Sequence, residues 1–458
     1  MLLSKDRYRE VLTVSLPLVA STGSILVMEF TDRLFLAGYS LDAIAAALPA
    51  GIAAYFFIVI FQGTAGYVNV FVAQYDGSGQ PERIGEILWQ GIYFALAAAV
   101  LLALLATTGP WLFHHAGHPP VVQALEVVYF QTLMVGGGIN VLGAVFAGVF
   151  SGRGLTRPVM VSHALAAAVN IPLDYCLING IGPWPALGIL GAGIATVVAW
   201  SVTAALLAFP VFRRGSQSGY GVRKRRGLQP ALLRRLVLSG SPGAFQFAMD
   251  IFAFSFFIFM VGRIGQEALA VTNMVMSINA LAFMPMMGFS LGTSSLVGHA
   301  IGKGDIRLAS ERVKATLHVT NAYVLVIFIL LTVAPRWLLS LFHSAGIRPD
   351  QWTRINEDGI ILLRIIAVTI FFDAGYMVFT GALKGAGDTR FIMWSLLLLS
   401  GGVMVLPVWI GVQVFGQGLF YVWFCVAVFI VSLWGITGWR YSQGRWRAMR
   451  VVDGPPKP

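Results

Sequence analysis

Acidic side chains inside long apolar segments are the first candidates for chemistry in this chain. Five carboxylates lie in such segments: Glu29, Asp32, Asp174, Asp250 and Asp373. At the centre of a membrane-spanning helix a carboxylate costs about 2.5–3.5 kcal/mol on insertion scales. Each therefore needs a partner, a water-filled cavity or a function.

Three oxygen-bearing residues of the first half form one candidate site. Asn170 and Asp174 are four residues apart in NIPLDY (170–175), so they share a helix face. Glu29 and Arg33 have the spacing of an intrahelical ion pair, which leaves Asp32 without a partner nearby in sequence. If the two segments face each other, Asp32, Asn170 and Asp174 form an oxygen-rich cavity for Na⁺ or for protons. The alternative is a fixed polar network between helices.

A second candidate site lies in the other half of the chain. Asp250 and Asp373 could attract a cationic substrate or carry a coupling proton, and helix–helix hydrogen bonding is the alternative. Met284 and Met287 belong to FMPMM (283–287), a soft apolar surface of the kind that tolerates varied ligands. Ordinary packing is the alternative for these methionines.

Other kinds of chemistry have little support in the sequence. The loop FHHAGHPP (113–120) holds three histidines without an adjacent carboxylate or cysteine, so we predict neither a metal nor a cofactor. The two cysteines, Cys176 and Cys425, fall in apolar segments and are predicted to be buried thiols. No phosphate-binding loop of the Walker type, nucleophile elbow or HExxH motif occurs, which disfavours an ATP-driven pump and a polytopic membrane enzyme.

The composition specifies the elements that must position these residues. Hydrophobic residues make up 57% of the 458 residues, charged residues 11%, and the mean hydropathy is +0.78, which excludes a soluble globular protein. Roughly 260 apolar residues suffice for about a dozen spans. We predict an all-α integral membrane protein with a retained first helix and twelve transmembrane helices, near 11–38, 43–74, 88–112, 121–150, 157–179, 187–212, 232–262, 267–300, 315–342, 356–383, 391–413 and 417–439.

The net charge of +11 reports on topology rather than on nucleic acid. With twelve spans, 25 of the 31 Lys and Arg residues fall on the side of the termini, 4 fall on the other side, and Arg33 and Arg364 lie inside spans. By the positive-inside rule both termini are cytoplasmic, which predicts a multi-pass protein of the bacterial inner membrane. The basic segment 213–230 is then a cytoplasmic anchor, with a dedicated lipid or regulatory site as the alternative.

The two halves of the chain repeat each other. At an offset of 225, Pro17 aligns with Pro242, Gly77 with Gly302 and Gly79 with Gly304. At an offset of 233, GVFSGRGLTRPVM (148–160) aligns with GALKGAGDTRFIM (381–393). One insertion around 340–356 explains the shift. Six spans per repeat predict two lobes related by a pseudo-twofold axis along the membrane normal. The predicted parts are an N-lobe (1–212), a linker (213–231), a C-lobe (232–440) and a tail (441–458).

These features resemble the multidrug and toxic compound extrusion (MATE) family over about residues 10–440. The most specific match is Asp373 followed by GALKGAGDTR (381–390), and TDRLFLAGYSLDAIAAALPAG (31–51) and the Pro242 to Asp250 spacing are also similar. The resemblance implies two six-helix lobes that export cationic or amphipathic drugs and toxic organic compounds by antiport with Na⁺ or H⁺. It also implies a monomer in the lipid bilayer, alternating access between the lobes and no nucleic-acid partner.

Site residues carry over from the family one by one. Asp32, Asn170 and Asp174 match the first-lobe cation site, and Asp250 and Asp373 match acidic positions of the second lobe. Two departures from the family leave the identity of the coupling ion open between Na⁺ and H⁺. Arg33 lies directly beside Asp32, and the seventh predicted helix has Asp250 where many Na⁺-coupled members have Glu. A flippase of a lipid-linked oligosaccharide precursor is the main alternative; it is expected to need a basic cavity, whereas the intramembrane charges here are mainly acidic. A passive channel is a further alternative.

Overall fold

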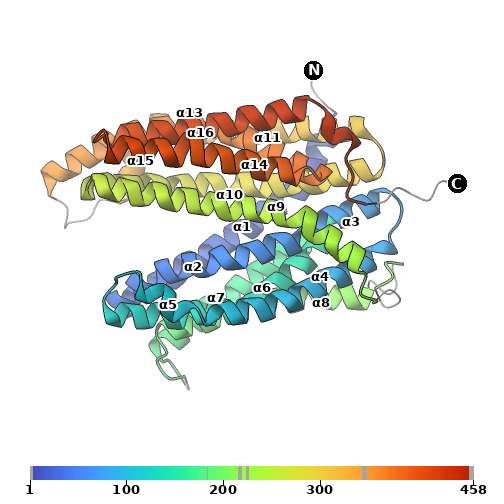
Figure 1. Cartoon of the computed structure of the whole chain (residues 1–458), viewed down its shortest axis with the longest axis horizontal. Helices are drawn as coiled ribbons and strands as arrows, with labels where there is room; N and C mark the ends of the chain where they lie inside the picture. Colours follow the sequence, from blue (N-terminus) through green and yellow to red (C-terminus); the bar gives the residue numbers. More distant parts are fainter. Residues whose placement is uncertain (1–3, 183, 215–218, 223–225, 343–347, 453–458) are drawn as a thin grey trace. The chain divides into compact units, whose positions relative to one another are not determined.

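The structure is a computed structural model that describes residues 4–182, 184–214, 219–222, 226–342 and 348–452. Across these ranges the regular structure is helical and no strand occurs. Within these described ranges, twelve helical segments are long and apolar enough to cross a membrane, which confirms the predicted all-α membrane fold (Figure 1).

The helices follow each other with short connections. Those of the first half are α1 (Lys5–Tyr39), α2 (Leu41–Gly66), α3 (Val68–Gly77), α4 (Arg83–Ala106), α5 (Gly109–His114), α6 (Pro120–Gly152), α7 (Arg157–Asn179) and α8 (Ile189–Arg214). Those of the second half are α9 (Pro230–Ile264), α10 (Gln266–Gly302), α11 (Ile306–Val333), α12 (Pro335–Ser340), α13 (Pro349–Ala386), α14 (Thr389–Leu399), α15 (Leu406–Gln413) and α16 (Leu419–Ser442).

Two predicted spans are displaced along the chain for the same reason. Predicted helix 88–112 is α4, which ends at Ala106, and predicted helix 315–342 is α11, which runs from Ile306 to Val333. In each case a proline or a Gly–Pro pair stops the long helix, and a short helix, α5 or α12, follows. The polar first turns of α11 were missed because hydropathy averages hide a helix that begins outside the apolar run.

One span changes its winding halfway. Between α14 and α15, residues Ser400–Val405 form a π-helical turn, and Pro407 stands in the first turn of α15. Proline lacks an N–H group and clashes with the preceding turn, so the helix widens before it. The predicted span 391–413 is therefore one bent element. Pro17, Pro172, Pro242 and Pro285 lie inside regular helices.

The sequence repeat has a counterpart in the backbone. Gly79 and Gly304, 225 residues apart, both adopt positive φ, at 71° and 74°. Gly154 and Gly387, 233 residues apart, do the same at 70° and 105°. Positive φ disfavours residues with a Cβ atom, so the same glycine-dependent turns end corresponding helices in both halves.

The chain forms two compact units that share helices. Unit 2 contains Leu16–Ala248, Gly298–Asp305 and Arg450–Pro458, and unit 1 contains Met1–Ser15, Met249–Val297 and Ile306–Met449. The first turns of α1 thus pack in unit 1 while the rest of α1 packs in unit 2, and α9 is divided in the opposite sense. The division into lobes at 213–231 stays a prediction from the repeat, and residues 215–218 and 223–225 of that linker lie outside the described residues.

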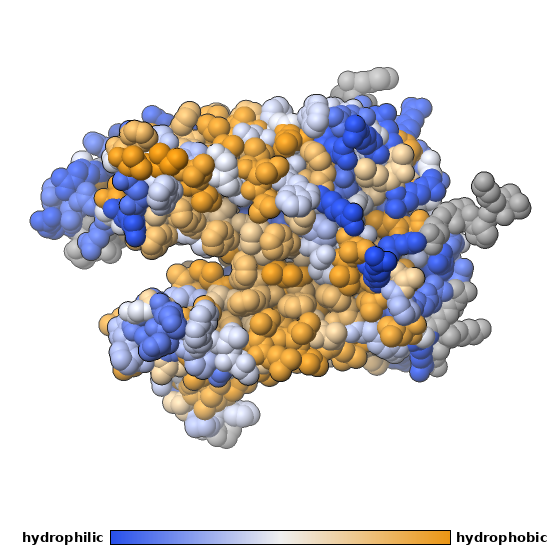
Figure 2. All heavy atoms as spheres, in the orientation of Figure 1, coloured by the Kyte–Doolittle hydropathy of each residue, from blue (hydrophilic) through white to orange (hydrophobic). Residues whose placement is uncertain are grey.

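Each unit is organised around one central helix. In unit 2, α6 packs against α2, α4 and α8; in unit 1, α13 packs against α11 and α16. Large hydrophobic side chains remain exposed on the outer faces, among them Leu104, Phe209, Leu398 and Phe424. Figure 2 shows hydrophobic side chains along the middle of the helices and hydrophilic ones towards their ends, the distribution expected of helices surrounded by lipid.

The two thiols differ in their surroundings. Cys425 is buried, as predicted, but the prediction for Cys176 was wrong, because its side chain is only partly buried. Cys176 follows Asp174 by two residues on α7, which turns it about 200° away from the buried face that carries the carboxylate.

Candidate functional site

Unit 2 brings together the three site residues predicted in the first half. Asp32 comes from α1, and Asn170 and Asp174 come from successive turns of α7. Their side chains are 6%, 0% and 0% exposed. The carboxyl groups of Asp32 and Asp174 adjoin each other, and the amide of Asn170 adjoins Asp174. The expected juxtaposition is therefore present, while its role in cation coupling stays a prediction.

A third helix contributes a residue that the sequence did not single out. Thr196 on α8 donates its hydroxyl hydrogen to Oδ2 of Asp32, with 3.3 Å between the oxygens, and it lies 3.0 Å from the carbonyl oxygen of Ala192. Tyr129 of α6 is buried beside the same carboxylates. A threonine inside an apolar run is a weak signal, because most such hydroxyls bond to their own helix backbone.

The buried oxygens of this cluster are not fully satisfied. Oδ1 of Asp32, both carboxylate oxygens of Asp174 and the amide atoms of Asn170 have no hydrogen-bond partner within the described part of the chain. Two adjoining carboxylates are both acceptors, so they can bond to each other only through a proton or a cation. Carboxylate, amide and hydroxyl oxygens form a hard donor set, which fits Na⁺ or H⁺ rather than a soft metal ion.

The predicted Glu29–Arg33 ion pair does not form. Both side chains are exposed, and their charged atoms stay beyond 4.0 Å from each other, although the charge of Arg33 acts on Glu29 and on Asp32. Arg33 therefore remains available as a positive charge near the cluster.

Unit 1 brings together the two acids predicted in the second half. Asp250 on α9 and Asp373 on α13 are half-buried and close enough for each charge to act on the other. Lys384, also half-buried, acts on Asp250. Asp373 and Lys384 are eleven residues, or three turns, apart on α13, about 16 Å along its axis and on the same face. The sequence count had placed Lys384 among the topological cations and missed its position beside Asp250.

The predicted methionines line α10 with mixed burial. Met284 and Met287 are partly buried, while Met286 between them is 0% exposed and belongs to the core of unit 1. A role of Met284 and Met287 in substrate binding stays a prediction.

Two of the three histidines of 113–120 contact other groups, and the rings of His114 and His115 lie 5.5 Å apart. His118 Nδ1 lies 2.7 Å from Oε1 of the buried Glu126, and His115 Nδ1 lies 2.8 Å from the carbonyl oxygen of Trp111. Among the residues that the structure describes, no three His, Cys, Asp or Glu side chains are grouped to hold a metal ion.

Known proteins with the same organisation were found in three comparisons. The MatE family model matches residues 17–176 and 242–410, once in each half. The probable multidrug resistance protein NorM of Pseudomonas syringae pv. tomato is 26% identical over 384 residues, covering 83% of this chain and 82% of the relative. The probable multidrug resistance protein NorM of Thermotoga maritima is 24% identical over 454 residues, covering 97% and 94%.

Solved structures share the fold over nearly the whole chain. The crystal structure of a MATE protein in the bent conformation has a TM-score of 0.85 at 19% identity and covers 97% of this chain and 96% of its own. A MOP superfamily transporter from Pyrococcus furiosus, whose binding pocket of reverse polarity was taken to suggest a different function, has a TM-score of 0.84 at 19% identity, with 96% of each chain covered. Since the MatE model accounts for most of both halves, this chain belongs to the multidrug and toxic compound extrusion family of transporters.

Proposed function

We propose that this transporter exports small organic cations or amphipathic compounds from the bacterial cytoplasm by antiport with Na⁺ or H⁺. The observation that carries the proposal is the buried cluster of Asp32, Asn170 and Asp174, in which every side-chain oxygen except Oδ2 of Asp32 lacks a partner among the described residues and which suits a monovalent cation. The relatives named as probable multidrug resistance proteins support the substrate class.

The proposed mechanism is alternating access by a single polypeptide. The coupling ion occupies the carboxylates of unit 2, and the organic cation is attracted by Asp250 and Asp373 of unit 1. Antiport requires that each ligand bind the inward-open and outward-open states with different affinity, because otherwise neither gradient affects the other. An inward-moving monovalent cation gains about 2.3 kcal/mol per 100 mV of membrane potential.

The orientation is proposed from the charges of the loops. The excess of Lys and Arg on the side of the termini supports a location of both termini in the cytoplasm of a bacterium. Export then means movement from the side of the linker 213–231 to the side of the loop between α7 and α8.

Efflux from proteoliposomes tests the proposal directly. Purified protein is reconstituted with a fluorescent organic cation, and either a Na⁺ gradient or a pH gradient is imposed alone. Dye movement against its own gradient with one of the two ions confirms antiport and identifies the ion. Equilibration of dye without accumulation would indicate a passive channel, and absence of movement under both gradients would overturn the proposal.

A further inference from the structure

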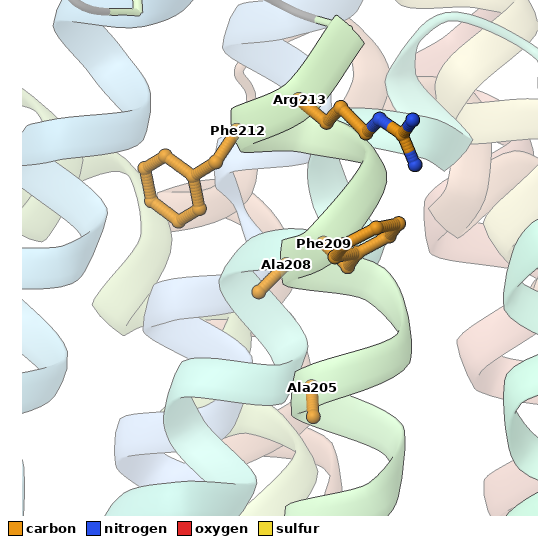
Figure 3. Close-up of a pocket in the computed structure, with 5 residues that line it drawn as sticks. All are labelled: Ala205, Ala208, Phe209, Phe212 and Arg213. Carbon is orange, nitrogen blue, oxygen red and sulfur yellow. The ribbon is translucent and has the colours of Figure 1, made fainter.

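The end of α8 carries a shallow apolar groove that the transport proposal does not use. Ala205, Ala208, Phe209, Phe212 and Arg213 line it, at the i, i+3, i+4, i+7 and i+8 spacing of one helix face. Its volume is about 460 Å³. In Figure 3 the two alanines leave the floor low, Phe212 lies on one side, and Phe209 and the side chain of Arg213 lie on the other.

A positive charge stands at the helix end of this groove without a carboxylate to neutralise it. The guanidinium carbon of Arg213 is 5.5 Å from the ring centroid of Phe209. Helix α8 contains no Asp or Glu, and in the described ranges Arg213 forms no ion pair. Phe209 is 64% exposed, so the apolar wall below the charge is open to the surroundings.

A second arginine stands next to the opposite wall. The Phe212 ring is 6.0 Å from the Trp89 ring of α4, and the guanidinium carbon of Arg226 is 5.7 Å from the Trp89 ring. The backbone of Arg226 is held in place, because its carbonyl oxygen accepts a hydrogen bond from the Tyr93 hydroxyl, with 2.5 Å between the oxygens. Trp89 itself donates to the carbonyl oxygen of Val222 over 2.8 Å.

This combination indicates an amphipathic anion. A soluble anion would bind the arginines without using the apolar floor, and a neutral hydrophobic molecule would leave both charges unpaired. The groove lies at the end of a membrane-spanning helix, where an acyl chain runs along the helix and a phosphate reaches its end. Trp89 is of a residue type that is enriched at this interfacial depth.

We propose that this groove, formed by Ala205, Ala208, Phe209, Phe212 and Arg213, binds one anionic phospholipid. One acyl chain lies on the alanine floor between the phenylalanine rings, and Arg213 and Arg226 hold the phosphate group. The site is separate from the acidic clusters of both units. It depends only on the membrane-spanning assignment of α8, so it can fail or stand independently of antiport.

Retention of lipid by the purified full-length protein tests the site. The protein is incubated with equimolar phosphatidylglycerol and phosphatidylcholine of identical acyl chains, and the lipids that stay bound are counted by native mass spectrometry. We expect wild-type protein to retain phosphatidylglycerol preferentially. Arg213→Gln should lower that preference about fivefold, the effect of roughly one basic side chain near an anionic headgroup.

Two groove variants and one matched arginine variant complete the design. Ala205→Phe fills the floor of the groove from an exposed position, and Phe209→Gln removes one of its walls. Each variant should reduce retention of phosphatidylglycerol. If one of them fails to fold, the other still tests the groove. Arg157→Gln removes an equally exposed arginine at the start of α7 and should leave retention unchanged. Equal retention by wild type, Arg213→Gln and the groove variants would overturn the proposal. Displacement of the lipid by inorganic phosphate, with no effect of the groove variants, would overturn it in favour of a free-anion site.

Discussion

At the scale of single residues, two adjoining buried carboxylates can contact each other only with a proton or a cation between them. Asp32 and Asp174 repel each other when both are ionised, and neither lies where water can screen the charge. A cation between them removes the repulsion and supplies the partners that their oxygens lack. This property is the basis of the proposed coupling between an ion gradient and a conformational change.

The first prediction concerns these carboxylates. Asp32→Asn and Asp174→Asn each remove one negative charge while keeping the size of the side chain, so ion-driven efflux should fall to background while membrane insertion is retained. Dye efflux from proteoliposomes measures the loss. Asp42→Asn, at an exposed position in the first turn of α2, is the matched control and should transport normally. Full efflux by either site variant would remove that residue from the mechanism.

The second prediction concerns the acids of unit 1. Asp373→Asn removes one of the two charges that attract an organic cation, and a loss of about 1.4 kcal/mol in attraction raises the KM for cationic dyes roughly tenfold. Efflux of a neutral amphipathic compound should change little. Glu357→Gln, an exposed acid on the same helix, serves as the control. An unchanged KM for cations would return Asp373 to a structural role.

Residue patterns predicted part of this site, and for a clear reason. Asn170 and Asp174 share a face because they are one helical turn apart, which sequence spacing alone determines. Thr196 of α8 donates to Asp32 of α1, 164 residues earlier, and the charge of Lys384 on α13 acts on Asp250 of α9. Contacts of that kind depend on how helices pack, and neither residue has a neighbour in sequence that signals its role.

At the scale of elements, the first turns of α1 are fixed to α11 by buried charge. Arg312 is 4% exposed; it forms an ion pair with Glu10, and its Nη1 donates to the carbonyl oxygen of Leu296 over 2.6 Å. The predicted helix began at residue 315, so Arg312 fell in the loop before it. Hydropathy could not reveal that Arg312 is buried, because its partner Glu10 lies 302 residues away in the sequence. The beginning of α11 could therefore not be predicted from its own residues.

The third prediction tests this attachment. Glu10→Gln removes the negative charge that pairs with the buried guanidinium of Arg312, which should destabilise the protein by about 3 kcal/mol. Thermal unfolding of the detergent-solubilised protein measures the effect. Glu311→Gln is the control, because Glu311 also pairs with two arginines, Arg7 and Arg307. These arginines are more exposed than Arg312, so water competes for their charges and the effect of the control should be far smaller. Equal melting temperatures for Glu10→Gln and wild type would contradict a stabilising role.

Equivalent positions of the repeat make equivalent close contacts. In unit 2, a Cβ at Gly240 would lie 2.8 Å from the carbonyl oxygen of Thr64 and 2.9 Å from the Cβ of Tyr67. In unit 1, a Cβ at Gly292 would lie 2.3 Å from the Oγ of Ser15. Positions 15 and 240, and 67 and 292, correspond at the offset of 225. At the crossing of α2 and α9 the glycine belongs to α9, and at the corresponding crossing of α10 and α1 it belongs to α10.

The fourth prediction follows from that crossing. Gly240→Ala inserts a methyl group against backbone that cannot move aside, which should destabilise the protein by about 1–3 kcal/mol and lower its melting temperature. Gly435→Ala adds the same group within α16 where no atom lies within 4 Å. It should be neutral or stabilising by up to about 1 kcal/mol, because alanine favours helix. The close approach would be refuted if both variants melted alike.

At the scale of the whole molecule, the repeat preserves the scaffold and changes the chemistry. Corresponding turns, short helices and glycine contacts recur, so the number of spans and their order were predictable. The acids do not recur: Asp32 corresponds to Phe257, and Asp373 corresponds to Asn140. One half therefore carries the oxygen cluster suited to a small cation, while the other carries acids with a lysine beside them. This difference supports the proposed division of labour between coupling ion and substrate.

The fifth prediction concerns the direction in which the whole chain is inserted. Because 25 of 31 basic residues share the side of the termini, inversion would require moving that excess across the membrane. A green fluorescent protein fused to the C-terminus should fluoresce, since it folds in the cytoplasm, and alkaline phosphatase at the same position should be inactive. Fusions truncated after Gly182, in the loop between α7 and α8, should give the opposite pair of signals. The reverse result at both positions would place the basic linker on the outer side of the membrane and the groove of α8 with its lipid in the outer leaflet. The proposed export would then be uptake.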